Sequence, residues 1–124
     1  MSKVFDSTVL IAHLRGERRA TDLLLGTPRA ERLVSVMSRV EIEGGMCSAE
    51  RQQVAALFSY LRMKPVTDAI ARRAGGYLRQ YRRSHQGIDL VDYVIAATAE
   101  HLQADLITLN VKHFPMVAEL EPPW

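Results

Sequence analysis

Four acidic residues of this chain stand where helices are predicted to begin. Asp6 follows the apolar segment KVF, and Glu41 lies three residues after Ser38. Asp89 and Asp92 precede the apolar run VIAATA and, at this spacing, fall on one side of a helix. Each position has an ordinary structural explanation. Asp is a favoured helix N-cap, Ser-x-x-Glu is the pattern of a capping box, and acidic side chains interact favourably with a helix N-terminus.

The acids also fall where the carboxyl ends of parallel strands would converge. Carboxylates held close together raise one another's pKa unless a cation compensates their charge. Oxygen ligands without Cys or His suit Mg²⁺ or Mn²⁺, and such ions bind phosphate oxygens and activate water for attack on phosphorus. Helix capping and a metal site therefore both remain open as interpretations of the spacing alone.

The elements that would position these acids alternate between short apolar strands and helical stretches. This alternation predicts parallel strands joined by crossover helices, and thus an α/β fold in which helices outweigh strands. In such a sheet, ligands bind beyond the carboxyl ends of the strands. We expect strands at Lys3–Phe5, Leu33–Val36, Pro65–Val66 and Leu106–Leu109, and helices at Thr8–Arg15, Arg18–Leu25, Val40–Met46, Glu50–Arg62, Asp68–Arg83 and Leu90–Leu102.

The composition is ordinary for a globular protein of 124 residues, of which 48% are hydrophobic and 24% charged. The net charge is only +2, so binding to a polyanion would depend on local clusters of charge. The single cysteine, Cys47, cannot form an internal disulfide and fits a reducing compartment. The first residues lack a signal peptide's apolar core, and no apolar run approaches the roughly 20 residues of a membrane span. We expect one domain over residues 1–124, located in the cytoplasm.

Basic side chains are concentrated in the segment ARRAGGYLRQYRRSHQG, which ends just before Asp89. One interpretation is the solvated polar face of a helix, and the other is a track for the phosphates of a polyanion that leads to the acids. A second basic cluster follows the first predicted helix. The first cluster comprises Arg72, Arg73, Arg79, Arg82, Arg83 and His85, and the second Arg15, Arg18 and Arg19.

Four short segments, in their order and separation, resemble the PIN domain family, most closely the VapC-type toxins of bacterial toxin–antitoxin pairs. The segments are VFDSTVLIAHLRG, SVMSRVEIEGG, DYVIAATAE and LITLNVKHFP, and the resemblance runs from Val4 to the closing EPPW. Asp6 falls on the family's first acidic position and Glu41 on the glutamate of its Ser/Thr-x-x-Glu element. Asp92 falls on the aspartate that precedes IAATA.

The resemblance implies a small central parallel sheet flanked by helices in three α/β/α layers. It also implies a metal-dependent endoribonuclease that cuts cellular RNA and is held inactive by an antitoxin protein. For such an enzyme, the primary candidates for RNA binding are Arg79, Arg82 and Arg83. Asp6, Glu41 and Asp92 would hold one Mg²⁺ or Mn²⁺, partly through waters, and an activated water would attack the phosphodiester. Ser7 and Thr8, like Ser38, could orient water or the ligand carboxylates, although hydroxyls at helix starts are usually caps.

The chain departs from the family after the fourth predicted strand, where many relatives carry an aspartate and this sequence has Asn110 and His113. Asn110 can offer a neutral carbonyl oxygen to a metal but adds no negative charge, which puts a second metal position in doubt. Asp89 could supply some of the missing charge, although its position favours a helix cap. His113 is interpreted as a surface residue or as a hydrogen-bond partner of a ligand.

Two other functions remain open at this point. A phosphoacceptor receiver domain has a similar length and an acidic pocket, and Lys112 could mimic its lysine. The single Asp6 and the helical positions of Glu41 and Asp92 argue against it. A PIN relative that binds RNA without cutting it is the second alternative, because Asn110 weakens the predicted metal site.

The predicted helix over Glu50–Arg62 carries a wide apolar surface. Val54, Leu57, Phe58 and Leu61 recur at helical spacing, and Ala55, Ala56 and Tyr60 broaden that surface. It exceeds what one face of a sheet needs to cover, and similar PIN toxins are commonly homodimers. We therefore expect this protein to form a homodimer.

Overall fold

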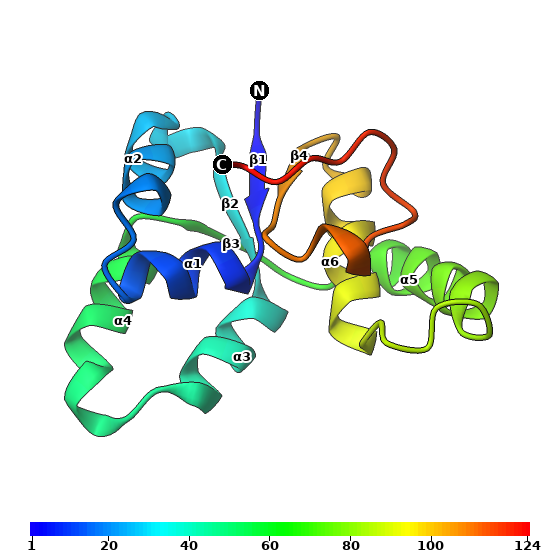
Figure 1. The fold of residues 1–124 in the computed structure, drawn as a ribbon, viewed down its shortest axis with the longest axis horizontal. Coiled ribbons are helices and arrows are strands. Elements are labelled where there is room, and N and C mark those ends of the chain that lie inside the picture. The colour runs from blue at the N-terminus through cyan, green and yellow to red at the C-terminus, as the bar shows by residue number, and fades with distance from the viewer.

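Four short parallel strands form the centre of the computed structural model, which describes residues 1–124 (Figure 1). Their order across the sheet is β3-β2-β1-β4. In the central strand, Val4 lies opposite Leu33 on one side and Leu106 on the other. The strands are β1 (Lys3–Phe5), β2 (Arg32–Ser35), β3 (Arg62–Lys64) and β4 (Asp105–Ile107).

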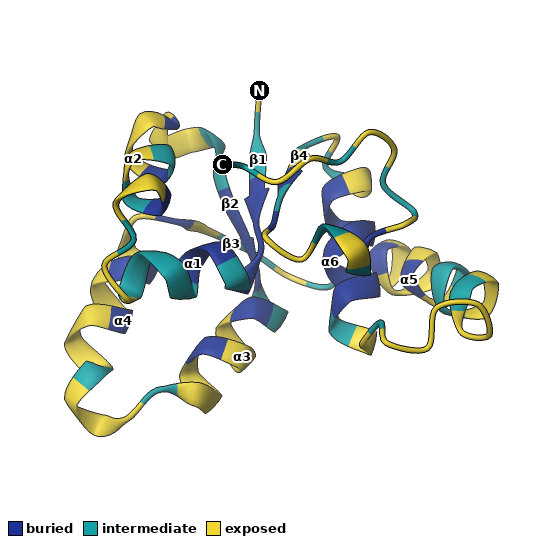
Figure 2. Cartoon of the chain, viewed as in Figure 1, coloured by how far each residue is buried: buried dark blue, intermediate teal, exposed yellow.

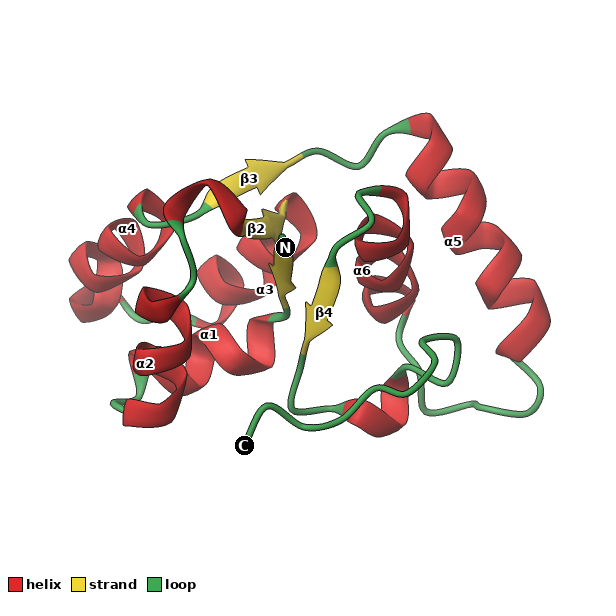
Figure 3. Ribbon diagram, turned by 90° about the horizontal axis from the view of Figure 1, so that it is seen from above, coloured by secondary structure: helices red, strands yellow, loops and turns green.

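Six helices cover the two faces of this sheet and complete the predicted three-layer α/β/α arrangement (Figures 1 and 3). Because successive side chains of a strand point to opposite faces, Val4 and Phe5 belong to different cores. The Phe5 core is closed by α1, α2, α3 and α4, and the Val4 core by α6, on which α5 packs. The helices are α1 (Ser7–Leu14), α2 (Arg18–Gly26), α3 (Val36–Gly45), α4 (Arg51–Ser59), α5 (Asp68–Tyr81) and α6 (Leu90–His101).

Helix α6 is the most deeply buried helix, as Figure 2 shows by its colour. Its residues from Asp92 to Ala99 are all buried, which explains why the sequence is apolar on every side there. Helix α5 lies outside α6 and buries only Ile70 and Ala74. No helix of the structure has the length and apolar character needed to cross a membrane.

The third strand was predicted wrongly. It spans Arg62–Lys64 and pairs with β2, whereas Pro65 and Val66 belong to the connection into α5. Proline has no N–H to donate to a sheet ladder, which makes the neighbouring polar segment RMK the better strand. Helix α4 accordingly ends at Ser59 and does not reach Arg62, and a short 3₁₀ turn over Ser48–Glu50 precedes it.

Helix α3 begins at Val36, four residues before the predicted start at Val40. Ser35 ends β2 and caps the helix, since its side chain accepts a hydrogen bond of 3.1 Å from the Met37 N–H. The other predicted boundaries differ by one or two residues from the observed ones. The first, second and sixth helices end at Leu14, Gly26 and His101, the fifth at Tyr81, and the fourth strand at Ile107.

The large apolar residues of α4 are used inside the protein. Val54, Leu57 and Phe58 are buried in the Phe5 core, as is Leu61 just beyond the helix. Of the broader apolar surface predicted for this helix, only small residues and Tyr60 remain exposed, Tyr60 at 41%. The surface left for a second copy is thus smaller than the sequence suggested.

Candidate active site

The predicted acids gather beyond the carboxyl ends of β1, β2 and β4. Strands β2 and β3 follow one another on one side of β1, whereas β4 lies on its other side. The strand order therefore reverses between β1 and β4. Open parallel sheets bind their ligands at such a point. Asp6 directly follows β1 and Thr108 directly follows β4, and both are buried there, at 2% and 0% exposure.

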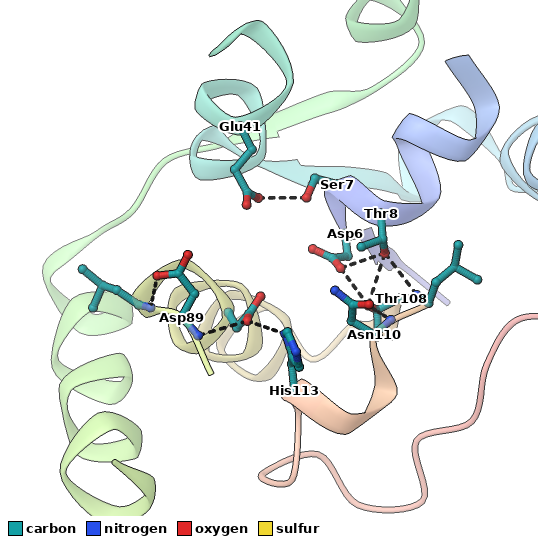
Figure 4. Close-up of polar contacts among 11 residues, drawn as sticks. Asp6, Ser7, Thr8, Glu41, Asp89, Thr108, Asn110 and His113 are labelled. Carbon is teal, nitrogen blue, oxygen red and sulfur yellow. Dashed lines mark hydrogen bonds and ion pairs between the residues drawn. The ribbon is translucent and has the colours of Figure 1, made fainter. Parts of the chain in front are cut away.

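Asp6 occupies the N-cap position of α1 but does not cap the helix with its side chain. Its Oδ2 accepts hydrogen bonds from the Thr8 and Thr108 hydroxyls, at 2.9 and 2.7 Å. Thr8 Oγ1 accepts in turn from the Leu109 N–H at 3.1 Å. Two hydroxyls therefore fix one carboxylate oxygen, and the other oxygen has no hydrogen bond (Figure 4).

Glu41 is not part of a capping box, so that interpretation of Ser38 and Glu41 was wrong. Both residues lie inside α3, whose cap is Ser35. Glu41 Oε1 accepts a hydrogen bond of 2.8 Å from the Ser7 hydroxyl at the start of α1. Ser38 is fully buried, and its hydroxyl has no hydrogen-bond partner.

Asp89 is the N-cap of α6, as its position in the sequence favoured. Its Oδ1 accepts from the Leu90 N–H at 2.7 Å, and the residue is exposed. Asp92 takes part in the same capping box, because its Oδ2 accepts from the Asp89 N–H at 3.3 Å. That oxygen also lies 3.0 Å from Nδ1 of His113, which reaches it from the turn after β4. Asp92 thus combines a cap with a contact that brings two distant segments together.

Electrostatic repulsion among these acids is not relieved by any Lys or Arg, since no such side chain forms an ion pair with Asp6, Glu41 or Asp92. Desolvation raises the pKa of Glu41, as do the charges of Asp6, Asp92 and Asp89, while the Ser7 hydrogen bond opposes the rise. Burial also raises the pKa of Asp92, with a contribution from Asp6. The Asp89 N–H and His113 oppose that rise. The site therefore favours uptake of a proton or binding of a cation.

The carboxylates of Glu41, Asp6 and Asp89 reach a shared space from different elements (Figure 4). No three His, Cys, Asp or Glu side chains come close enough to enclose an ion directly. The donor set still fits a hard divalent cation, because it consists of carboxylate oxygens with uncompensated charge. Such ions, Mg²⁺ above all, commonly keep several water ligands, which lets carboxylates bind them at longer range.

Asn110 lies beside Asp6 in Figure 4, at the start of the turn that carries His113. Its backbone N–H donates to Thr108 Oγ1 at 3.0 Å, and its exposed side chain has no hydrogen bond. The amide oxygen is therefore free to face a ligand. Lys112 is exposed and forms no ion pair with the acids.

The basic residues lie apart from the acids. Arg79, Arg82 and Arg83 are exposed at the end of α5 and form no ion pairs, whereas Arg73 pairs with Glu100 at 3.5 Å. In the second cluster, two of the three arginines have acidic partners: Arg18 pairs with Asp22 and Arg19 with Glu17.

Thr108 is the site residue that the sequence interpretation missed. It is fully buried and joins β4 to Asp6 through its hydroxyl. A signal was present, because a hydroxyl residue directly follows the strand segment DLI, where a parallel sheet gathers its site residues.

The fold and the acids define a three-layer parallel α/β protein with an acidic site at the strand ends. A family model of the PIN domain matches residues 3–120. Ribonuclease VapC10 of Mycobacterium tuberculosis (strain ATCC 25618 / H37Rv) is 52% identical over 120 residues, which cover 96% of this chain and 90% of the relative. Ribonuclease VapC19 of the same strain is 45% identical over 98% of this chain and 99% of its own. The chain belongs to the PIN domain family, in its VapC group.

Solved structures support this assignment of the fold. A chain of a toxin–antitoxin complex from Klebsiella pneumoniae is 26% identical, with a TM-score of 0.83 over 99% of this chain and 98% of that chain. A chain of the DNA-bound VapBC from Salmonella typhimurium has the same fold, with a TM-score of 0.83 at 17% identity.

Proposed function

We propose that this protein is a divalent-metal-dependent endoribonuclease that hydrolyses RNA phosphodiester bonds and acts as the toxin of a toxin–antitoxin pair. The observation that carries the proposal is the cluster of Asp6, Glu41 and Asp92 at the point where the sheet order reverses, with no basic side chain to compensate it. The names of the two ribonuclease relatives, which align with nearly all of this chain, support the same activity.

Asp6, Glu41 and Asp92 are the residues that would hold one Mg²⁺ or Mn²⁺, partly through water, and the Asn110 amide would lie beside Asp6 as a further oxygen donor. When bound, the ion lowers the pKa of water and stabilises charge that develops on the phosphate. Asp89 serves mainly as a helix cap, because it is the N-cap residue of α6 and its Oδ1 accepts from the Leu90 N–H.

Hydroxyl groups and one histidine orient these carboxylates. Thr8 and Thr108 hold Asp6 Oδ2 and leave the second oxygen available, and Ser7 holds Glu41. His113 Nδ1 lies 3.0 Å from Asp92 Oδ2, so its role here is to orient that carboxylate by a hydrogen bond. Partners of this kind fix the direction of a metal ligand and usually matter for affinity.

The cellular setting follows from the relatives. The complex from Klebsiella pneumoniae is described as a toxin–antitoxin complex, which supports an antitoxin protein as the partner of this chain. We propose that the chain acts on RNA in the cytoplasm as one PIN domain. We also propose a homodimer, in which the exposed residues of α4 and the residue that follows it, Tyr60, form part of the contact.

The test is cleavage of a single-stranded RNA by the purified protein in EDTA, and then after addition of Mg²⁺ or Mn²⁺. We expect cleavage only with the metal, and none from Asp92→Asn. The matched control is Asp22→Asn on α2, an exposed aspartate far from the site, which should cut like the wild type. Metal-independent cleavage would overturn the proposal. Binding without cleavage would identify an RNA-binding PIN relative that has lost catalysis. Membership of the PIN domain family already rules out a receiver domain.

A further inference from the structure

A hollow of about 590 Å³ opens beside the acids, on the side of α1 that faces the turn after β4. Thr8 and Asn110 form the wall next to the acidic site, and Arg15 forms the opposite end. Ile11 and Leu109 supply apolar surface between these ends. The hollow is therefore polar at both ends and apolar in the middle, as ligand sites commonly are.

The near wall of the hollow is built from the same groups that position Asp6. Thr8 Oγ1 donates to Asp6 Oδ2 and accepts from the Leu109 N–H, at 2.9 and 3.1 Å. Asn110 follows directly and bonds through its N–H to Thr108 Oγ1. A group bound in the hollow would thus lie next to whatever the acids hold.

The far end of the hollow carries a positive charge that no ion pair neutralises. Arg15 is exposed at the end of α1 and takes part in no ion pair. It also lines a second, smaller hollow, together with Glu41 and Glu50. The one acidic residue in the larger hollow is Glu17, whose carboxylate pairs with Arg19. Arg15 is therefore the cation available to an anionic ligand in this hollow.

The separation between the two ends suits a strand of RNA. Thr8 and Arg15 are seven residues apart along one helix, which corresponds to about 10 Å at 1.5 Å per residue. Stacked nucleotides of one strand advance by about 3.4 Å, so this distance spans two to three nucleotides. Gly16 follows Arg15 at this end of the hollow, and its φ of +87° lies in the left-handed region that favours glycine.

We propose that this hollow binds a nucleotide of the RNA strand next to the bond that is cut, with the Arg15 guanidinium on its phosphate. The inference rests on the proposed ribonuclease function and adds the place where the flanking strand is held. Arg15 is the contact that positions the strand through its phosphate, and Ile11 with Leu109 form the apolar surface beside the sugar and base.

The experiment measures binding of a fluorescein-labelled single-stranded RNA that the wild-type protein cuts, in EDTA, between 50 and 200 mM salt. We expect Arg15→Ala and Arg15→Gln to weaken binding about tenfold and to reduce the slope of log K against log salt by about 0.7, the value for one phosphate contact on a single strand. Arg15→Lys should recover part of the affinity. The matched control is Arg18→Ala, since Arg18 is 91% exposed on α2 and lies outside the hollow.

Several outcomes would overturn this inference. Arg15 variants with wild-type affinity and salt slope would show that the hollow does not hold RNA. An equal effect of Arg15→Ala and Arg18→Ala would indicate a diffuse basic field. Unchanged RNA binding with a weakened antitoxin complex would assign the hollow to the partner protein. If the wild-type protein itself neither cuts RNA nor binds it, the proposed function has failed, which is a different result from failure of the Arg15 variants alone.

Discussion

Replacing Thr108 with valine removes one hydroxyl and almost no volume from the centre of the site. In the wild-type protein this buried hydroxyl donates to Asp6 Oδ2 at 2.7 Å and accepts from the Asn110 N–H at 3.0 Å. A hydrogen bond to a charged group contributes about 1.5 to 3 kcal/mol, so we expect Thr108→Val to lower the free energy of unfolding by that amount. Asp6 would also lose half of the bonds that fix its direction.

The consequence for metal binding is larger than the change in stability suggests. Loss of a hydrogen bond to a ligating carboxylate typically costs about 10- to 100-fold in metal affinity. Urea unfolding of the metal-free protein and calorimetric titration with Mn²⁺ measure the two effects separately. RNA cleavage at limiting Mg²⁺ should fall with the affinity, while saturating Mg²⁺ should restore much of it.

Thr98→Val is the matched control for this prediction. Thr98 is also fully buried, but its hydroxyl bonds only to the Val94 carbonyl, at 2.7 Å, within α6. Its replacement should leave Mn²⁺ affinity unchanged. If Thr108→Val binds Mn²⁺ as tightly as Thr98→Val does, the Thr108 hydroxyl does not position a metal ligand, and the role given to Asp6 loses its support.

The remaining predictions concern charge and assembly. Glu41→Gln and Asp92→Asn should each abolish metal-dependent cleavage. Glu41→Gln should also raise the melting temperature of the metal-free protein, because it relieves repulsion between Glu41 and the neighbouring acids. Variants that lose their fold but cut RNA normally per folded molecule would contradict the role of these acids as metal ligands. Folding raises the pKa of Glu41 above its ordinary value of 4.5 and that of Asp92 above 3.8. The stability that these two protonated acids contribute is therefore present below the ordinary values and is lost as pH rises through the raised pKa values. Mn²⁺ affinity should rise over the same pH range, because the ion binds the deprotonated carboxylates. Asp89→Asn should weaken cleavage less than Asp92→Asn, and an equal effect would make Asp89 a ligand. Asn110→Asp should tighten Mn²⁺ binding by about 1 to 3 kcal/mol, and unchanged affinity would place residue 110 outside the site. Light scattering at tens of micromolar should give the mass of a dimer, and a strictly monomeric mass would count against the proposed assembly.

The order of strands and helices was predictable because short apolar strands alternate with helical stretches along most of the chain. It failed at β3, a three-residue strand with the sequence RMK in which Arg62 is exposed. So short a polar edge strand has no alternating pattern, and its pairing with β2 depends on tertiary contacts. Pro65 and Val66 looked more strand-like locally but lie outside the ladder.

The site was predictable to the extent that its residues follow strands directly. Asp6 could be placed from its position after KVF, and the helix cap at Asp89 from local pattern. The contact between His113 and Asp92 joins residues that are 21 positions apart, and Thr108 reaches Asp6 across 102 positions. Contacts over such separations follow from how the strands assemble, which local spacing does not encode.

Diffraction from crystals soaked in Mn²⁺, recorded where manganese scatters anomalously, tests the central claim most directly. The acid cluster predicts one anomalous peak between the carboxylates of Asp6, Glu41 and Asp92, and its loss in Asp92→Asn crystals. A peak elsewhere on the protein, or none at concentrations that support RNA cleavage, would contradict the assignment of these three residues as the metal site.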